Sequence, residues 1–293
     1  MSVDSFIIDG TRSPIGTKNG QMVGVRSDDL TAQVILGLMK RNENVPSEVV
    51  EDVVVGCAFP EGPQGMLMAR SISVLADLPI ESGAKIVNRF CGSSMDSVHQ
   101  LSQAILAGDI DAGIAGGVED MFGVPMGGFN PSFNPELYEK EFYIGMGEST
   151  EILAKDLDIS REDQEAFAVK SHEKALAAIA AGRYDNEIIP AQVNGVEVSK
   201  DEGPRTPDLD KIKSLDPAFD ADGTITAATS SPISIGAAAA LIMGGDKAKE
   251  LGLSPKFKIK SRAVAGVEWT RMGSGPLPAT EKALAKAGLQ LSD

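Results

Sequence analysis

The stretch Val87-Asn-Arg-Phe-Cys91-Gly-Ser-Ser-Met95 decides the fold, because a cysteine joins a short apolar segment to a helical one. We predict a strand at residues 85–88 and a helix that begins near Gly92. Gly108 fits the left-handed position that ends such a helix. The predicted inward face of the helix consists of Met95, Val98, Leu101 and Ile105. Cys91 is therefore expected directly before a helix N-terminus.

Cys91 has two interpretations at that place. Unpaired amides and the helix dipole favour a thiolate, and the small neighbouring residues leave room for a substrate, as a thioester-forming nucleophile requires. A packed structural cysteine is the other interpretation, and we expect that role for Cys57. No base is evident, because His99 would lie about 12 Å along the helix axis and His172 lies in a polar, solvated segment.

Outward from this stretch, strands alternate with helices. Further strands are predicted at residues 6–9, 53–55 and 111–116, and Ser27 is predicted to cap a helix. The apolar face of that helix is Leu30, Val34, Ile35 and Leu38. This alternation predicts a layered α/β fold with a largely parallel sheet.

The second half of the chain is less regular. We predict an irregular segment at 122–135, a helix from Ser160 to about Gly182 and a polar loop at 186–224. Small residues dominate 225–243 and permit close backbone packing. A strand at 256–267 and a helix at 280–287, ended by Gly288, complete the prediction.

Composition excludes several classes of function. The 293 residues suggest about two domains, and 27 basic against 42 acidic residues give a net charge of −15. This charge argues against nucleic acids and anionic membranes as partners. Residues 237–243, the longest apolar run, are too few to span a membrane, and no signal peptide is evident. Two cysteines and two histidines predict no disulfide framework and no metal site, which favours a cytoplasmic protein.

The motifs resemble those of one enzyme family. Asn88-Arg-Phe-Cys91-Gly-Ser-Ser-Met95 resembles the nucleophile motif of the thiolases, and Thr11-Arg-Ser-Pro-Ile-Gly16 resembles their opening motif. Other similar segments follow in the family's order: Gly116-Gly-Val-Glu-Asp-Met121, Asp201-Glu-Gly-Pro-Arg205, Pro217-Ala-Phe219, Gly223-Thr-Ile-Thr-Ala227 and Met272-Gly-Ser-Gly-Pro276. The resemblance covers the whole chain.

The resemblance implies a thiolase-like α/β fold and acyl transfer between coenzyme A thioesters, in either the Claisen or the thiolytic direction. Cys91 would carry the acyl group, with its own amide in an oxyanion hole. The positions matching the pantetheine channel are Met146, Phe219, Ala227, Ser231 and Met272. The resemblance implies no cofactor beyond coenzyme A as substrate or product, and a homodimer or homotetramer. Lys200, Arg205, Lys211 and Lys213 are either phosphate partners or solvated loop charges.

The family's domains map onto the chain in three parts. Residues 1–117 with 231–254 correspond to the N-terminal domain, 118–230 to the loop domain over coenzyme A, and 255–293 to the start of the C-terminal domain. The family's Asn-Glu-Ala-Phe, Gly-His-Pro and Cys-x-Gly-Gly-Gly motifs do not occur. We therefore expect a C-terminally truncated thiolase with little turnover, whose missing C-terminal piece is a further candidate partner.

Two alternatives stay open. A non-catalytic acyl-CoA-binding or assembly subunit would bind coenzyme A tightly without acylation of Cys91. A ketoacyl-carrier-protein synthase would share the fold and the cysteine, and would act only on carrier-protein thioesters. The sequence does not specify acyl chain length or reaction direction.

Overall fold

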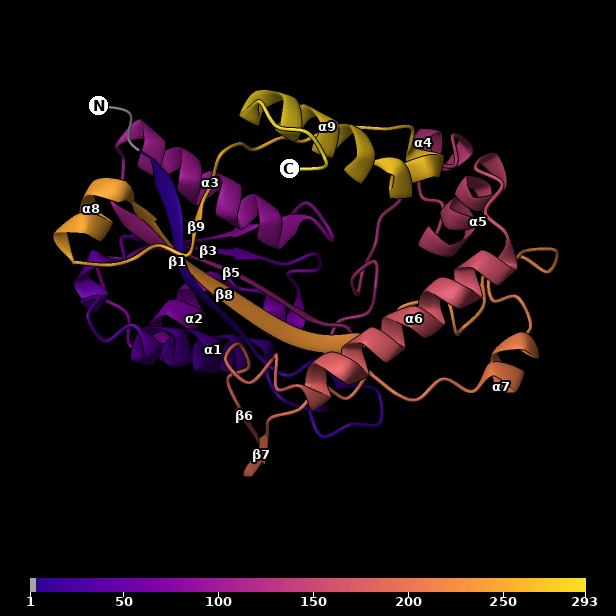
Figure 1. The fold of residues 1–293 in the computed structure, drawn as a ribbon, viewed down its shortest axis with the longest axis horizontal. Coiled ribbons are helices and arrows are strands. Elements are labelled where there is room, and N and C mark those ends of the chain that lie inside the picture. Colours follow the sequence, from indigo (N-terminus) through magenta and orange to yellow (C-terminus); the bar gives the residue numbers. More distant parts are fainter. Residues whose placement is uncertain (1–3) are drawn as a thin grey trace. The chain divides into compact units, whose positions relative to one another are not determined.

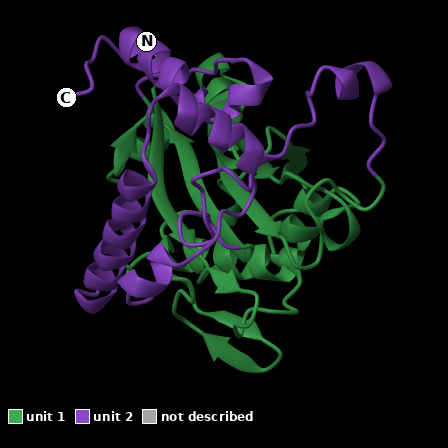
Figure 2. Cartoon of the chain, turned by 90° about the vertical axis from the view of Figure 1, so that its right-hand side faces the viewer, with its two compact units in different colours: residues 1–130, 184–203, 233–259 green, residues 131–183, 204–232, 260–293 purple. Residues whose placement is uncertain are grey.

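The computed structural model describes residues 4–293 (Figure 1), which form two compact units (Figure 2). The first unit comprises the described residues up to Asn130 together with Tyr184–Gly203 and Ile233–Ile259. The second comprises Pro131–Arg183, Pro204–Pro232 and Lys260–Asp293. The three-domain division given above stays a prediction.

The first unit is built on a seven-stranded sheet in the order β4-β3-β5-β8-β1-β9, with β2 beside β8. The strands are β1 (Ser5–Arg12), β2 (Gly16–Thr17), β3 (Asp52–Gly56), β4 (Gly83–Val87), β5 (Ala112–Asp120), β8 (Ser234–Gly244) and β9 (Phe257–Lys258). Strand β3 runs parallel to β4 and β5, whereas β8 runs antiparallel to β5, β1 and β2.

The α/β class is confirmed, but the prediction of a largely parallel sheet is wrong. Helical crossovers make the β3, β4 and β5 part parallel. The sequence prediction did not recognise β8 as a strand, because its Ala237-Ala-Ala-Ala240 run lacks the branched residues typical of strands. Its long antiparallel pairing with both neighbours makes the sheet mixed.

Helices cover both faces of this sheet (Figure 1). Helices α1 (Ser27–Arg41) and α2 (Met68–Leu75) lie on one face, and α3 (Ser93–Ala107) lies on the other. Val53 and Val55 belong to the larger buried cluster, and Val54 packs with Leu101 and Ile105 of α3. Successive strand residues face opposite sides, so burial on both sides explains the unbroken valine run.

Two details of the helix predictions are corrected. Ser27 is the first residue of α1 rather than its cap, and its hydroxyl lies 3.5 Å from the Gln64 side-chain oxygen. Met95 is 64% exposed, because the buried face of α3 repeats every four residues from Ser93 through Ser97 to Leu101. The predicted left-handed end at Gly108 is confirmed, with φ of +80°.

A buried carboxylate in β1 ties the sheet to its surroundings. Asp9 is 4% exposed and accepts hydrogen bonds from Arg41, Asn42, Lys256 and the Gly10 amide. Burial raises the pKa of this carboxyl, but the hydrogen bonds and the Arg41 charge outweigh that and leave its pKa below its ordinary value.

The rest of the first unit consists of short elements. These are the 3₁₀ turns η1 (Ser47–Val49) and η2 (Gly62–Gln64), the hairpin of β6 (Ala191–Val193) and β7 (Val196–Val198), and α8 (Gly245–Glu250). The hairpin corrects the prediction of a continuous loop at 186–224. The strand predicted at 256–267 is limited to Phe257–Lys258, because the chain passes into the second unit at Lys260.

The second unit is mainly helical. Its elements are α4 (Pro135–Glu139), α5 (Met146–Asp156), α6 (Arg161–Ala180), α7 (Leu209–Lys213), η3 (Trp269–Ser274) and α9 (Pro276–Ala287). The start of α6 is confirmed, because the Ser160 hydroxyl accepts from the Asp163 amide. Helix α9 begins four residues before the prediction, at Pro276, and ends at Gly288 with φ of +66°.

Candidate active site

Cys91 lies exposed in a tight turn between β4 and α3. Phe90, directly before it, has φ of +46°, a left-handed conformation that is rare for a bulky residue. The Gly92 amide donates to the Arg89 carbonyl at 3.0 Å, and the Ser93 amide donates to the Phe90 carbonyl at 3.0 Å. The turn therefore presents the Cys91 side chain outward at the start of a helix.

Two side chains hold the backbone of this turn. The Asn88 carboxamide oxygen accepts from the Phe90 amide at 2.9 Å, and its nitrogen donates to the Ala58 carbonyl at 2.8 Å. The Ser93 hydroxyl accepts from the Arg89 amide and donates to the Phe90 carbonyl. These bonds oppose relaxation of the strained Phe90 conformation.

Two paired glycines let α3 approach the sheet. Gly56 of β3 and Gly117 of β5 lie opposite each other in the parallel ladder. A Cβ atom on Gly56 would lie 2.4 Å from backbone atoms of Ser93 and Ser94, and one on Gly117 would lie 1.8 Å from the Ser94 hydroxyl. The first turn of α3 therefore rests on the bare backbone of two strands.

The local electrostatics favour negative charge at this helix start. Within residues 4–293, the amides of Cys91, Ser94 and Met95 have no hydrogen-bond acceptor. Such amides and the helix dipole stabilise an anion at a helix N-terminus. The arrangement suits an oxyanion that forms beside the Cys91 sulfur.

A second group of polar side chains, Cys57 and Glu119, lies at the ends of β3 and β5. Cys57 is 1% exposed, and its sulfur lies 3.8 Å from a Glu119 carboxylate oxygen. Burial and, secondarily, the Glu119 charge raise the pKa of the Cys57 thiol to about 12. Cys57 is thus a buried neutral thiol, and its predicted role as a packed core residue is confirmed.

Both histidines are partly buried. His99 lies further along α3. His172 was predicted to be solvated; its Nδ1 accepts from the Arg205 amide at 3.4 Å in an exposed hydrogen bond within the second unit. Among residues 4–293 no three metal-ligating side chains gather, and no helix there is long and apolar enough to span a membrane.

The five residues matched to the pantetheine channel all belong to the second unit, and Cys91 belongs to the first. Met146 begins α5, the Phe219 ring lies against Gly147, and Met272 belongs to η3, which packs on α5. All three side chains are between 43% and 45% exposed. The structure thus brings three of the five together around α5.

The other two, Ala227 and Ser231, lie exposed in the loop that follows Thr224. This loop is attached to α5 by the Glu151 carboxylate, which accepts from the amides of Thr224 and Ile225 at 2.8 to 3.0 Å.

The four basic candidates are exposed side chains. Lys200 lies in the first unit, whereas the others lie in the second, with Lys211 and Lys213 in α7. Their assignment to phosphate or to solvent stays open.

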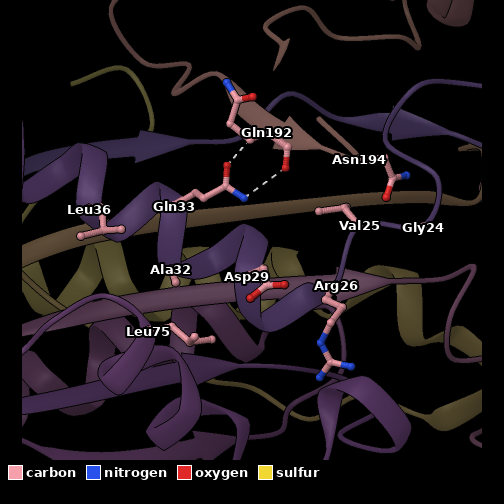
Figure 3. A pocket seen from close by; sticks show the side chains of 10 residues that line it. All are labelled: Gly24, Val25, Arg26, Asp29, Ala32, Gln33, Leu36, Leu75, Gln192 and Asn194. Atoms are coloured by element: carbon pink, nitrogen blue, oxygen red, sulfur yellow. Dashed lines mark hydrogen bonds between the residues drawn. The ribbon is translucent and has the colours of Figure 1, made fainter. Parts of the chain in front are cut away.

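A depression of about 480 Å³ lies elsewhere on the first unit (Figure 3). Gln33 of α1 and Gln192 of β6 form reciprocal hydrogen bonds across part of its wall. The whole lining consists of Gly24, Val25, Arg26, Asp29, Ala32, Gln33, Leu36, Leu75, Gln192 and Asn194. It contains none of the predicted site residues.

Sequence reasoning missed the partners of the motif residues. Arg12 donates two hydrogen bonds to Asp201, at 2.7 and 2.9 Å, and a third to Glu187 at 2.8 Å. The opening motif is therefore fastened to the Asp201-Glu-Gly-Pro-Arg205 motif. Opposite charges in both motifs were the available signal, but sequence distance hid the pairing.

Comparisons with known proteins agree with this architecture. Residues 5–246 match the family model described as thiolase, N-terminal domain. A 3-ketoacyl-CoA thiolase of Alcanivorax borkumensis is 45% identical over 300 residues, which cover 99% of this chain and 76% of the relative. One of Bacillus subtilis is 42% identical over 307 residues, covering 99% and 78%. One of Marinomonas sp. is 45% identical over 302 residues, covering 99% and 76%. The chain belongs to the thiolase family.

Proposed function

We propose that Cys91 is the nucleophile of a thiolase-type acyltransferase and accepts an acyl group from a coenzyme A thioester. One observation carries the proposal. In a chain of the thiolase family, the exposed Cys91 precedes helix α3, and within residues 4–293 the amides of Cys91, Ser94 and Met95 have no acceptor.

The acyl-transfer step follows from this position. The Cys91 sulfur attacks the thioester carbonyl carbon, a carbon–sulfur bond forms, and the bond to the coenzyme A sulfur breaks. The proton lost by Cys91 leaves with coenzyme A. Backbone amides at the start of α3 lower the energy of the oxyanion in the tetrahedral intermediate.

The substrate class is part of the proposal. The relatives are named 3-ketoacyl-CoA thiolases, so we assign this chain to thiolysis of 3-ketoacyl-CoA or the reverse Claisen condensation. Coenzyme A is substrate or product, and these steps need no metal or redox group. The exposed apolar side chains around α5 and the loop holding Ala227 and Ser231 are proposed to contact pantetheine.

We also propose self-association through the β4 edge. Within the described residues β4 pairs only with β3. Exposed apolar side chains flank it, among them Val74 at 61%, Ile80 at 78% and Phe90 at 64%. Such surface favours a second copy of the chain. An Ile80→Asp variant should shift sedimentation toward the monomer, and unchanged sedimentation of a folded variant would contradict this.

Intact mass spectrometry after brief exposure to acetyl-CoA tests the nucleophile. We expect the mass of one acetyl group, mapped to Cys91 and absent in Cys91→Ser. Cys57→Ser serves as the matched cysteine control and should still be acylated, because Cys57 is buried. Binding of coenzyme A without any acylation would overturn the proposal and favour a non-catalytic acyl-CoA-binding subunit.

A further inference from the structure

We propose that Glu119 is a positioning residue for the Cys91 turn and acts through the Ala58 peptide and the Asn88 side chain. The role rests on the proposed function of Cys91. Glu119 lies near the end of β5, two residues beyond Gly117, the last strand position that packs against α3.

Glu119 holds the backbone where β3 ends. One carboxylate oxygen accepts from the Ala58 amide at 2.7 Å, and the other accepts from the Gln64 side-chain nitrogen at 2.8 Å. Gln64 is fully buried and also accepts from the Asp120 amide at 2.6 Å. The Glu119 carboxylate therefore links the segment after β3 to the end of β5 in one hydrogen-bond network.

The Ala58 peptide passes this restraint to the turn. Its amide is held by Glu119, and its carbonyl accepts from the Asn88 side chain at 2.8 Å. Asn88 in turn accepts from the amide of Phe90, the residue before Cys91. Three hydrogen bonds thus connect Glu119 to the strained residue that aims the cysteine.

The aromatic side chains support the same path. The ring of Phe59, the residue after Ala58, lies 5.9 Å from the ring of Phe90. A shift of the segment after β3 would therefore disturb both the Asn88 hydrogen bonds and the Phe59–Phe90 ring contact of the turn. Neutral Cys57 adds a weak thiol contact to Glu119, which leaves the carboxylate surrounded by donors.

A positioning role differs from a general stabilising role in what its loss changes. Acyl transfer requires the sulfur to meet the thioester carbonyl in a defined geometry, and an error of about 1 Å costs up to ~100-fold in rate. Alkylation by iodoacetamide requires no bound geometry, so its rate reports the exposure and the thiolate fraction of Cys91, both of which acetylation also requires. The ratio of the two rates isolates alignment.

The experiment measures both rates in the full chain with Glu119→Ala, Glu119→Gln and Asn88→Ala. In both alanine variants we expect acetylation of Cys91 by acetyl-CoA to fall by roughly 10- to 100-fold, with alkylation within about threefold of wild type. Glu119→Gln keeps an oxygen for the Ala58 amide but turns an NH2 group toward the Gln64 side-chain nitrogen, so it should recover part of the rate. Glu61→Gln is the matched control, because Glu61 accepts from the Phe129 amide, outside this path.

Coupling and hydrogen exchange separate this inference from the proposed function. In a relay, the double variant should be no slower than the slower single variant, whereas additive losses would contradict it. The Phe90 amide should exchange at least about tenfold faster in Glu119→Ala. If wild type is not acetylated, the proposed function fails, and exchange alone decides the positioning role. Unchanged acetylation in folded Glu119→Ala, or unchanged exchange at Phe90, would overturn the inference.

Discussion

Replacing Gly56 by alanine should displace the start of α3 and slow the chemistry of Cys91. The added Cβ would lie 2.4 Å from backbone atoms of Ser93 and Ser94. Carbon contacts are favourable near ~3.5 Å, so the helix start or the strand must move by about 1 Å. Backbone on both sides leaves no flexible side chain to absorb the movement.

The magnitude follows from this overlap. Overpacking of this kind costs about 1–3 kcal/mol in the free energy of unfolding. A loss of ~2 kcal/mol lowers the melting temperature by roughly 4–8 °C in a chain of this size class. The same 1 Å displacement should reduce acetylation of Cys91 by up to ~100-fold.

Gly116→Ala is the matched control in the neighbouring strand. Its Cβ would meet Val55 at 3.4 Å and the Ala238 carbonyl at 3.6 Å, which are ordinary contacts. We expect its melting temperature and acetylation rate to stay near wild type. Thermal melting by circular dichroism and acetylation by intact mass check both variants. If Gly56→Ala melts and reacts like Gly116→Ala, the close approach does not support the site.

Three further outcomes are expected. Asp9→Asn should lower the free energy of unfolding by about 1–3 kcal/mol at pH 7, measured by urea unfolding. The pKa of the Asp9 carboxyl is lower in the folded than in the unfolded protein, where it is near 3.8. The stability that ionised Asp9 contributes is therefore present above the unfolded pKa and is lost as pH falls through the folded pKa. A stability difference between wild type and Asp9→Asn that does not change with pH would contradict this. In a thiol-reactivity assay of the native protein at pH 8, Cys91 alone should react, and Cys57 should react only after denaturation. Two thiols that react equally fast in the native protein would contradict the assignment of Cys57 as a buried neutral thiol. Glu151→Ala should speed amide exchange at Thr224 well beyond any change at Phe90, and equal effects would indicate global destabilisation.

Local patterns predicted much of the sheet and its helices. The valine run at 53–55 and the helix with Leu101 and Ile105 lie where their apolar patterns place them, because burial on one or both faces leaves a clear periodic signal. Strand β8 gave no such signal, since alanines are equally common in helices. Pairing with two distant strands makes it a strand.

The candidate site shows the same division. Cys91 and the helix start were evident from adjacent residues. The supports of the turn come from Gly56, Ala58 and Glu119, which are brought together only by strand pairing. The spacing of residues does not reveal that Gly56 in β3 faces the start of α3, a helix that follows a different strand. These supporting roles could therefore not be predicted from the sequence.

The position of β8 in the sheet has a consequence for synthesis on the ribosome. Strand β8 lies between β5 and β1, yet it is made after both, and 124 residues separate the end of β5 at Asp120 from its own end at Gly244. At about 5–20 residues per second this interval lasts roughly 6–25 seconds. Throughout it, β1 and β5 have edges that await their shared partner. Nascent chains should therefore depend on protection from chaperones until β8 emerges.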